Sequence, residues 1–152
     1  MKLNSNMEIS RKALKSINDH LQKKHAILEA RKLYDEGEYD DAYNIVDDLR
    51  QKNPDFGLTY FILGMIEMRN EQYDKGEELL NQAVKLGLPD EDMAWAFHNL
   101  GTSSLRKKDF EQAREFLEKA VGLNPNMEEN RKALNLLDYL QKKEGHQKGE
   151  GV

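Results

Sequence analysis

Apolar residues recur along the chain three and four positions apart, the period of amphipathic helices, and no stretch alternates apolar and polar residues as a strand does. Turn signals such as Gly37, Pro54 and Pro125 separate the periodic runs. The pattern predicts seven or eight helices and an all-α fold. After a first amphipathic segment, helices are predicted over about residues 24–36, 40–51, 57–69, 74–86, 90–107, 110–123 and 127–143.

The first amphipathic segment covers about residues 6–22. Its apolar face recurs near heptad spacing, at Met7, Leu14, Ile17 and Leu21. No Gly or Pro occurs between Ser5 and Asp35, so residues 6–22 and 24–36 are predicted either as two helices or as one long helix.

One order of residues occurs three times: a small residue, an aromatic residue nine positions later, and a second small residue three positions after that. The three sets are Ala30, Tyr39 and Ala42; Gly64, Tyr73 and Gly76; and Gly101, Phe110 and Ala113. Ala30 and Gly64 lie 34 positions apart, and Gly64 and Gly101 lie 37 apart. A repeat of this length predicts a stack of helical hairpins, and such stacks present binding surfaces more often than active sites.

These residues resemble the tetratricopeptide repeat, in which small residues let the two helices of a hairpin cross closely. The resemblance covers about residues 23–127 and implies an all-α right-handed αα-superhelix. The implied organisation is an N-terminal helix (1–22), three repeats (23–56, 57–93 and 94–127), a capping helix (128–143) and a disordered tail (144–152). The capping helix is expected to cover the last hairpin with inward-facing Ala133, Leu136, Leu137 and Leu140.

The composition agrees with a single domain and narrows the function. The chain has 152 residues, of which 38% are apolar and 34% charged, and it has no cysteine, which excludes disulfides and thiolate chemistry. The net charge of −5 and the lack of a basic stripe disfavour a nucleic-acid partner. No apolar run is long enough for membrane insertion, and the first residues lack the apolar stretch of a signal peptide, so a cytoplasmic protein is expected.

Charge is unevenly distributed along the chain. Residues 1–32 contain eight Lys or Arg and three Asp or Glu, whereas every charged residue from Asp35 to Asp48 is acidic. One interpretation is two solvated helix faces, since exposed ion pairs contribute little. The other is an N-terminal arm attracted to an acidic surface of its own chain or of a partner.

The resemblance also implies a groove, because the first helix of each repeat lines the inner face of such arrays. The middle repeat is apolar on nearly all sides there, so its first helix either lines a binding groove or is covered from within. Methionine and aromatic residues suit a groove that binds apolar or amphipathic peptides or helices. The candidate peptide-binding residues are Ile27, Tyr34, Phe61, Ile62, Met65, Met68, Arg69, Trp95, His98, Asn99 and Arg106.

Some co-chaperones of this family bind a C-terminal carboxylate with a clamp of Lys, Asn and Arg side chains. The matching positions here are Ile27, Arg31, Ile62, Trp95 and Asn99, and none carries the required residue type. A carboxylate clamp is therefore not expected. The size and layout of the chain also resemble the type III secretion chaperones that hold apolar translocator segments.

The sequence thus favours a protein-interaction adaptor or scaffold with a protein or peptide partner. The alternative is a self-associating or structural module whose groove is filled by the N-terminal helix, in the same chain or in a dimer mate. Catalysis has little support, because the four histidines form no i, i+4 pair and no metalloprotease, phosphate-loop or nucleophile motif occurs. We expect no enzyme activity, cofactor or metal.

Overall fold

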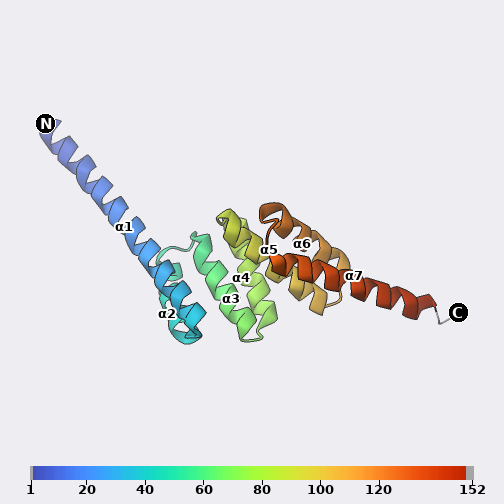
Figure 1. Ribbon diagram of the computed structural model, residues 1–152. Coiled ribbons are helices and arrows are strands. Elements are labelled where there is room, and N and C mark those ends of the chain that lie inside the picture. The colour runs from blue at the N-terminus through green and yellow to red at the C-terminus, as the bar shows by residue number, and fades with distance from the viewer. Residues whose placement is uncertain (1, 150–152) are drawn as a thin grey trace. The chain divides into compact units, whose positions relative to one another are not determined.

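The computed structural model describes residues 2–149, and in this part of the chain it contains seven helices and no strand (Figure 1). This confirms the predicted all-α helical-repeat fold. Contacts join α1 with α2, α3 with α4, α5 with α6, and α6 with α7. The helices are α1 (Lys2–Glu36), α2 (Tyr39–Lys52), α3 (Gly57–Arg69), α4 (Tyr73–Leu86), α5 (Asp90–Arg106), α6 (Phe110–Leu123) and α7 (Glu128–Gly149).

The chain divides into two compact units, Met1–Pro54 and Asp55–Val152. Unit 1 holds the hairpin of α1 and α2, and unit 2 holds α3 to α7. Most of the first predicted repeat therefore lies in unit 1, and the other two repeats and the predicted capping helix lie in unit 2.

In unit 1, α1 is one helix from Lys2 to Glu36, so residues 6–22 and 24–36 form one long helix rather than two. Residues 4–22 are exposed along their whole length, and burial begins only where α1 lies along α2. Because a continuous helix cannot fold back on itself, α1 extends past α2 (Figure 1). Met7, Leu14, Ile17 and Leu21 are 49–66% exposed, so they are not covered within unit 1.

The first helix of each hairpin ends in the same turn, with one residue in the left-handed region. These residues are Gly37, Glu71 and Lys108, with φ of 85°, 62° and 60°. The backbone N–H of each donates to the carbonyl three residues earlier, and the next N–H reaches back five residues, which satisfies the last carbonyls of the helix. The sequence signals only the first of these turns, since Glu and Lys take this conformation at a steric cost that Gly avoids.

Small residues bring the paired helices of unit 2 close together, as the repeat predicts. A Cβ atom on Gly64 of α3 would lie 2.9 Å from Cγ of Leu80 and 3.2 Å from the carbonyl oxygen of Gly76 in α4. A Cβ atom on Gly101 of α5 would lie 2.8 Å from Cγ of Leu117 in α6. Larger residues at these positions would push the helices apart.

The capping helix α7 closes the core of unit 2. Leu137 is fully buried and Ala133 nearly so, in one cluster with Leu105, Ala113 and Leu117. The prediction was wrong for Leu136, which is 50% exposed, because neighbouring residues on a helix point about 100° apart.

The predicted end of the capping helix at residue 143 was also wrong. Residues 144–149 continue α7, so they are helical rather than disordered. An ion pair between Glu144 and Lys108, at 3.6 Å, holds the start of this extension to the turn between α5 and α6. Residues 150–152 of the predicted tail lie outside the described residues.

Candidate functional site

The candidate surface in unit 2 is built by the first helices of its two hairpins and by the capping helix. α3 contacts α5, and α5 contacts α7. The repeat spacing of 37 and 34 residues brings Met65, Thr102 and Leu136 to equivalent positions on these helices. Met65 and Thr102 are half-buried and Leu136 is half-exposed. Together with Trp95 and Asn99 of α5, which are also half-buried, these residues define the α3/α5/α7 face.

Two of the predicted groove residues belong to the core. Phe61 and Ile62 are only 7% and 3% exposed, because α3 buries nearly its whole circumference. Met68 is half-buried, and its Cγ atom lies 2.9 Å from the place of a Cβ atom on Gly76, so it packs against α4. These three side chains therefore leave little surface for a peptide.

The other predicted site residues divide between the two units. In unit 1, Ile27 is buried, and the ring centroids of Tyr34 and Tyr39 lie 5.3 Å apart. In unit 2, Arg69 and Arg106 are exposed at the ends of α3 and α5. The guanidinium of Arg106 lies 3.2 Å from the ring centroid of Tyr73, a cation–π contact with the start of α4.

His98 joins α5 to the capping helix. Its Nδ1 lies 2.8 Å from Oδ1 of Asn130, which is fully buried, and the side-chain amide of Asn130 also contacts the sulfur of Met127. Burial lowers the pKa of His98 below its ordinary value, which the hydrogen bond to Asn130 and the charge of Glu129 only partly oppose. The neutral imidazole therefore donates from Nδ1 to Asn130, which makes His98 a packing residue.

The residues that α5 contributes to the α3/α5/α7 face, Trp95, Asn99 and Thr102, are uncharged. Trp95 packs edge-on against His98 with ring centroids 5.6 Å apart. The amide of Asn99 donates to the carbonyl of Trp95 at 2.8 Å, and the hydroxyl of Thr102 donates to the carbonyl of Asn99 at 3.0 Å. Since these polar groups bond within their own helix, the face offers apolar surface and few free polar groups to a ligand.

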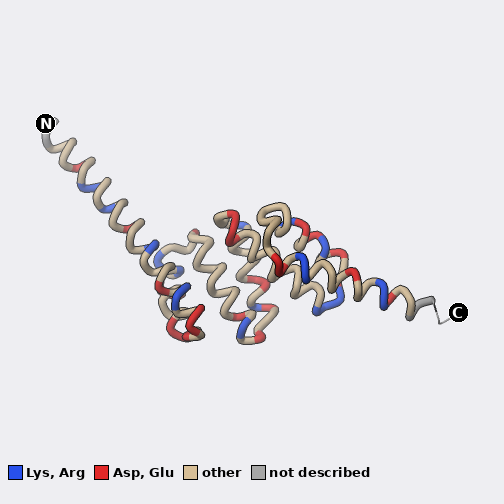
Figure 2. The backbone as a smooth tube through the Cα atoms, viewed as in Figure 1, with Lys and Arg blue, Asp and Glu red and all other residues tan. Residues whose placement is uncertain are grey.

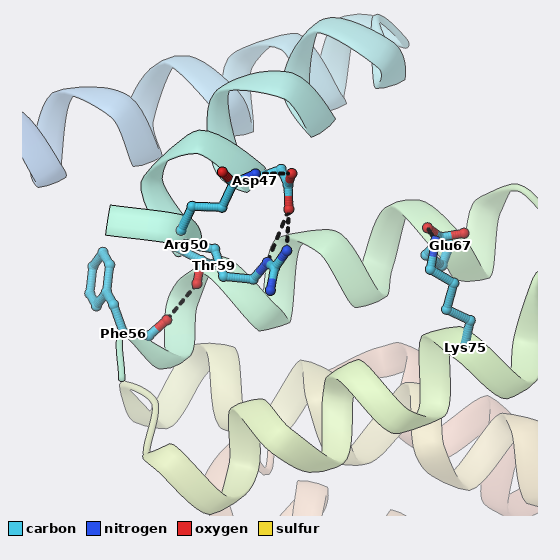
Figure 3. A network of polar contacts seen from close by, with 7 residues as sticks. Asp47, Arg50, Phe56, Thr59, Glu67 and Lys75 are labelled. Atoms are coloured by element: carbon cyan, nitrogen blue, oxygen red, sulfur yellow. Dashed lines mark hydrogen bonds and ion pairs between the residues drawn. The ribbon is translucent and has the colours of Figure 1, made fainter. Parts of the chain in front are cut away.

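The close-up in Figure 3 shows polar contacts that stabilise each unit separately. In α2 of unit 1, the Arg50 guanidinium donates to Oδ1 of Asp47 at 2.6 and 3.0 Å. In unit 2, the hydroxyl of the fully buried Thr59 donates to the carbonyl of Phe56 at 2.7 Å, at the start of α3.

The carboxylate of Glu67, buried in α3, pairs with Lys75 of α4 (Figure 3). We interpret this contact as a structural ion pair, because removing Lys75 would leave the buried carboxylate of Glu67 uncompensated. Among residues 2–149, no group of three or more His, Cys, Asp or Glu side chains is placed to hold a metal ion. In the same part of the chain, no helix has the length and apolar character needed to span a membrane.

Residues 55–125 match the family model of the tetratricopeptide repeat. These residues belong to that family. The predicted first repeat, residues 23–56, lies almost wholly outside the match and stays a prediction. No curated protein matches the chain.

Solved structures with the same fold include several tetratricopeptide proteins. The O-GlcNAc transferase of Thermobaculum terrenum is 23% identical with a TM-score of 0.69, over 78% of this chain and 22% of the transferase. The type III secretion translocator chaperone SycD of Yersinia enterocolitica is 18% identical with a TM-score of 0.67, over 80% of this chain and 85% of SycD. The second tetratricopeptide domain of human RPAP3, in complex with an HSP70 peptide, is 19% identical with a TM-score of 0.64, over 79% of this chain and 98% of that domain. At these identities the likeness shows the fold alone.

The sequence prediction missed Leu136 as a surface residue, although the repeat itself carried the signal. Counting 34 residues onward from Thr102 reaches Leu136, and counting 71 onward from Met65 reaches the same residue. The capping helix therefore continues the register of the repeats, and it adds an apolar side chain to the face that α3 and α5 begin.

Proposed function

We propose that unit 2 is a protein-interaction module that binds an apolar or amphipathic peptide or helix of another protein on the α3/α5/α7 face. The observation that carries the proposal is the half-exposed Leu136 in register with Met65 and Thr102. In the described part of unit 2, the exposed large apolar side chains are Leu136 and Tyr139, both on α7. A ligand that covers Leu136 and Trp95 gains affinity by removing apolar surface from water.

The ligand class follows from the character of the face. Helix-in-groove recognition uses apolar anchors at helical spacing, and a row of Met, Trp and Leu side chains suits such anchors. An acidic C-terminal peptide of the HSP70 type, which the RPAP3 domain binds, needs cationic groups on the equivalent helices. In unit 2, the positions where the family carries them are Trp95 and Asn99, and neither residue is cationic, so that ligand is disfavoured.

The experiment uses Trp95, the single tryptophan of the chain, as a reporter within the face. Peptides are selected on the full chain from a displayed library, and their binding is measured through the change in Trp95 emission. The selected peptides are expected to be apolar or amphipathic, and an acidic C-terminal peptide serves as the negative arm.

Two variants test the position of the site. Leu136→Lys should weaken binding of the selected peptides by about tenfold or more, the loss of one interface anchor. Ile9→Lys, at an exposed apolar residue of α1 in unit 1, is the matched control and should leave the affinity unchanged. Equal affinity of wild type and Leu136→Lys would exclude the α3/α5/α7 face, and selection of acidic C-terminal peptides would contradict the ligand class.

A further inference from the structure

The longest exposed apolar surface of unit 1 is a line along α1. Met7, Leu14, Leu21 and Leu28 recur at every seventh position, and Ile17 follows Leu14 after three. These residues form the α1 stripe, and they are exposed by 54%, 66%, 49%, 55% and 58% in the order just given. A line of apolar residues at steps of seven and three is the seam through which two helices form a coiled coil.

The α1 stripe faces away from α2. Lys23 and Ala26 of α1 line a cleft with Ile45 and Leu49 of α2, so this side of α1 is turned toward its hairpin partner. Leu28 follows Ala26 by two residues, or about 200° around the helix, which places the stripe on the opposite side. The stripe is therefore open to a second helix over its whole length, including the part of α1 that lies along α2.

The two edges of the stripe carry few charged residues. The coiled-coil positions that flank it from Met7 to Leu28 are Arg11, Ala13, Asn18, His20, His25 and Ile27, among which Arg11 alone is a Lys, Arg, Asp or Glu. The lysines at positions 12, 15 and 23 lie more than about 120° from its centre, on the back of the helix. Figure 2 shows Lys and Arg residues (blue) at intervals along α1. Two copies of α1 can therefore approach through the stripe without bringing these lysines together.

The polar residues of the seam select the direction of the second helix. Completing the heptad places Ser10 and Lys24 in line with Ile17. A parallel pair would set Lys24 against Lys24 of the second copy, and buried like charges oppose association. An antiparallel pair centred on Leu14 and Ile17 sets Ser10 against Leu21 and Lys24 against Met7, so every layer contains an apolar side chain. The stem of Lys24 can cover Met7 while its ammonium stays in water.

From this pattern we propose that the occupant of the α1 stripe is a second copy of this chain, docked antiparallel so that Leu14 of one copy packs against Ile17 of the other. The proposal concerns unit 1 and does not depend on the function proposed for unit 2.

The first test compares one substitution on and off the stripe. The full chain is examined by sedimentation velocity from about 1 to about 100 μM, where a dimer of micromolar affinity is resolved. Wild type should dimerise. Ile17→Lys, which acts twice in a symmetric dimer, should raise the dimer dissociation constant at least tenfold. Ile9→Lys is the matched control, because Ile9 is 65% exposed on the same helix but lies outside the stripe, and it should leave the constant unchanged.

The second test fixes the register, and it is simple because the chain has no cysteine. The double variant Ser10→Cys/Leu21→Cys should form disulfide-linked dimers on oxidation, since the two positions face each other in the antiparallel pair. The single variant Ser10→Cys should stay uncrosslinked, because its two copies would be about 16 Å apart along the axis, beyond the reach of a disulfide.

Three outcomes would overturn the proposal. A chain that stays monomeric up to about 100 μM excludes the second copy and leaves the stripe to a different protein. Equal effects of Ile17→Lys and Ile9→Lys would place a dimer contact elsewhere. Efficient crosslinking of Ser10→Cys alone would show a parallel pair and refute the register.

Discussion

The capping helix offers a sharp test of the packing in unit 2, because two adjacent leucines have opposite surroundings. Leu137 is 0% exposed and belongs to the cluster that includes Leu105 and Leu117, whereas Leu136 is 50% exposed. Both residues lie in the middle of α7, and truncation to alanine removes the same atoms and slightly favours helix formation at either site. Any difference between the two variants therefore reports burial.

The expected magnitudes follow from this contrast. Leu137→Ala removes apolar contacts and leaves a cavity, which costs about 2–5 kcal/mol in a rigid core. The loss should lie in the middle of this range, about 3 kcal/mol, because the smaller Ala113 and Ala133 beside Leu137 leave a site that can partly collapse. Leu136→Ala removes a side chain that water already reaches, so its cost should stay within about 0.5 kcal/mol.

The assay is urea unfolding followed through Trp95, which lies in α5 and reports unit 2 whatever the state of unit 1. With a slope of about 2 kcal/mol per molar, Leu137→Ala should lower the midpoint by about 1.5 M and Leu136→Ala by less than about 0.3 M. Equal midpoints for the two variants would refute the cap, since α7 would then be an appendage with no part in the core.

Two further comparisons test the packing of unit 2. Gly122→Ala in α6, where an added Cβ atom meets nothing within 4 Å, should raise the free energy of unfolding by about 0.5–1 kcal/mol in urea titrations. Gly101→Ala should lower it by about 1–3 kcal/mol, because the Cβ atom would meet Cγ of Leu117 at 2.8 Å, and an equal rise in both variants would contradict the close crossing. The pKa of His98 is lowered by burial, so its neutral form stabilises the fold above pH about 6.5, and this contribution is lost as the pH falls below that value. The free energy of unfolding should fall more between pH 7.5 and pH 5.5 in wild type than in His98→Gln. Equal losses in the two proteins would show that burial of His98 does not matter for stability.

The helices after residue 36 follow closely from the sequence. Residues 57–69 and 110–123 are predicted with the bounds that α3 and α6 have, and a proline marks one end of each run, since Pro54 precedes the first and Pro125 follows the second. The left-handed turns at Glu71 and Lys108 could not be read in this way, since neither residue favours that conformation by itself. Tertiary contacts between the paired helices impose it.

The candidate site was harder to predict, because periodicity identifies an apolar face but not what covers it. Phe61 and Ile62 share α3 with Met65, yet the first two are buried and only the third stays partly open. Leu136 and Leu137 are equally apolar, and their opposite roles depend on a rotation of about 100°. The repeat register, which carries each position from one helix to the next, separates such residues better than hydrophobicity does.

The N-terminal half of α1 links the sequence pattern to association. Residues 4–22 make no buried contact in unit 1, and an isolated helix of this length is marginal in water because its stability normally comes from packing. Its apolar residues nevertheless keep heptad spacing through Leu28, beyond the point where contact with α2 begins. Packing on α2 cannot account for that spacing, because the stripe lies on the opposite side of α1. The pattern therefore corresponds to a second helix that binds along the stripe, and the second copy proposed here has the same spacing in the reverse direction.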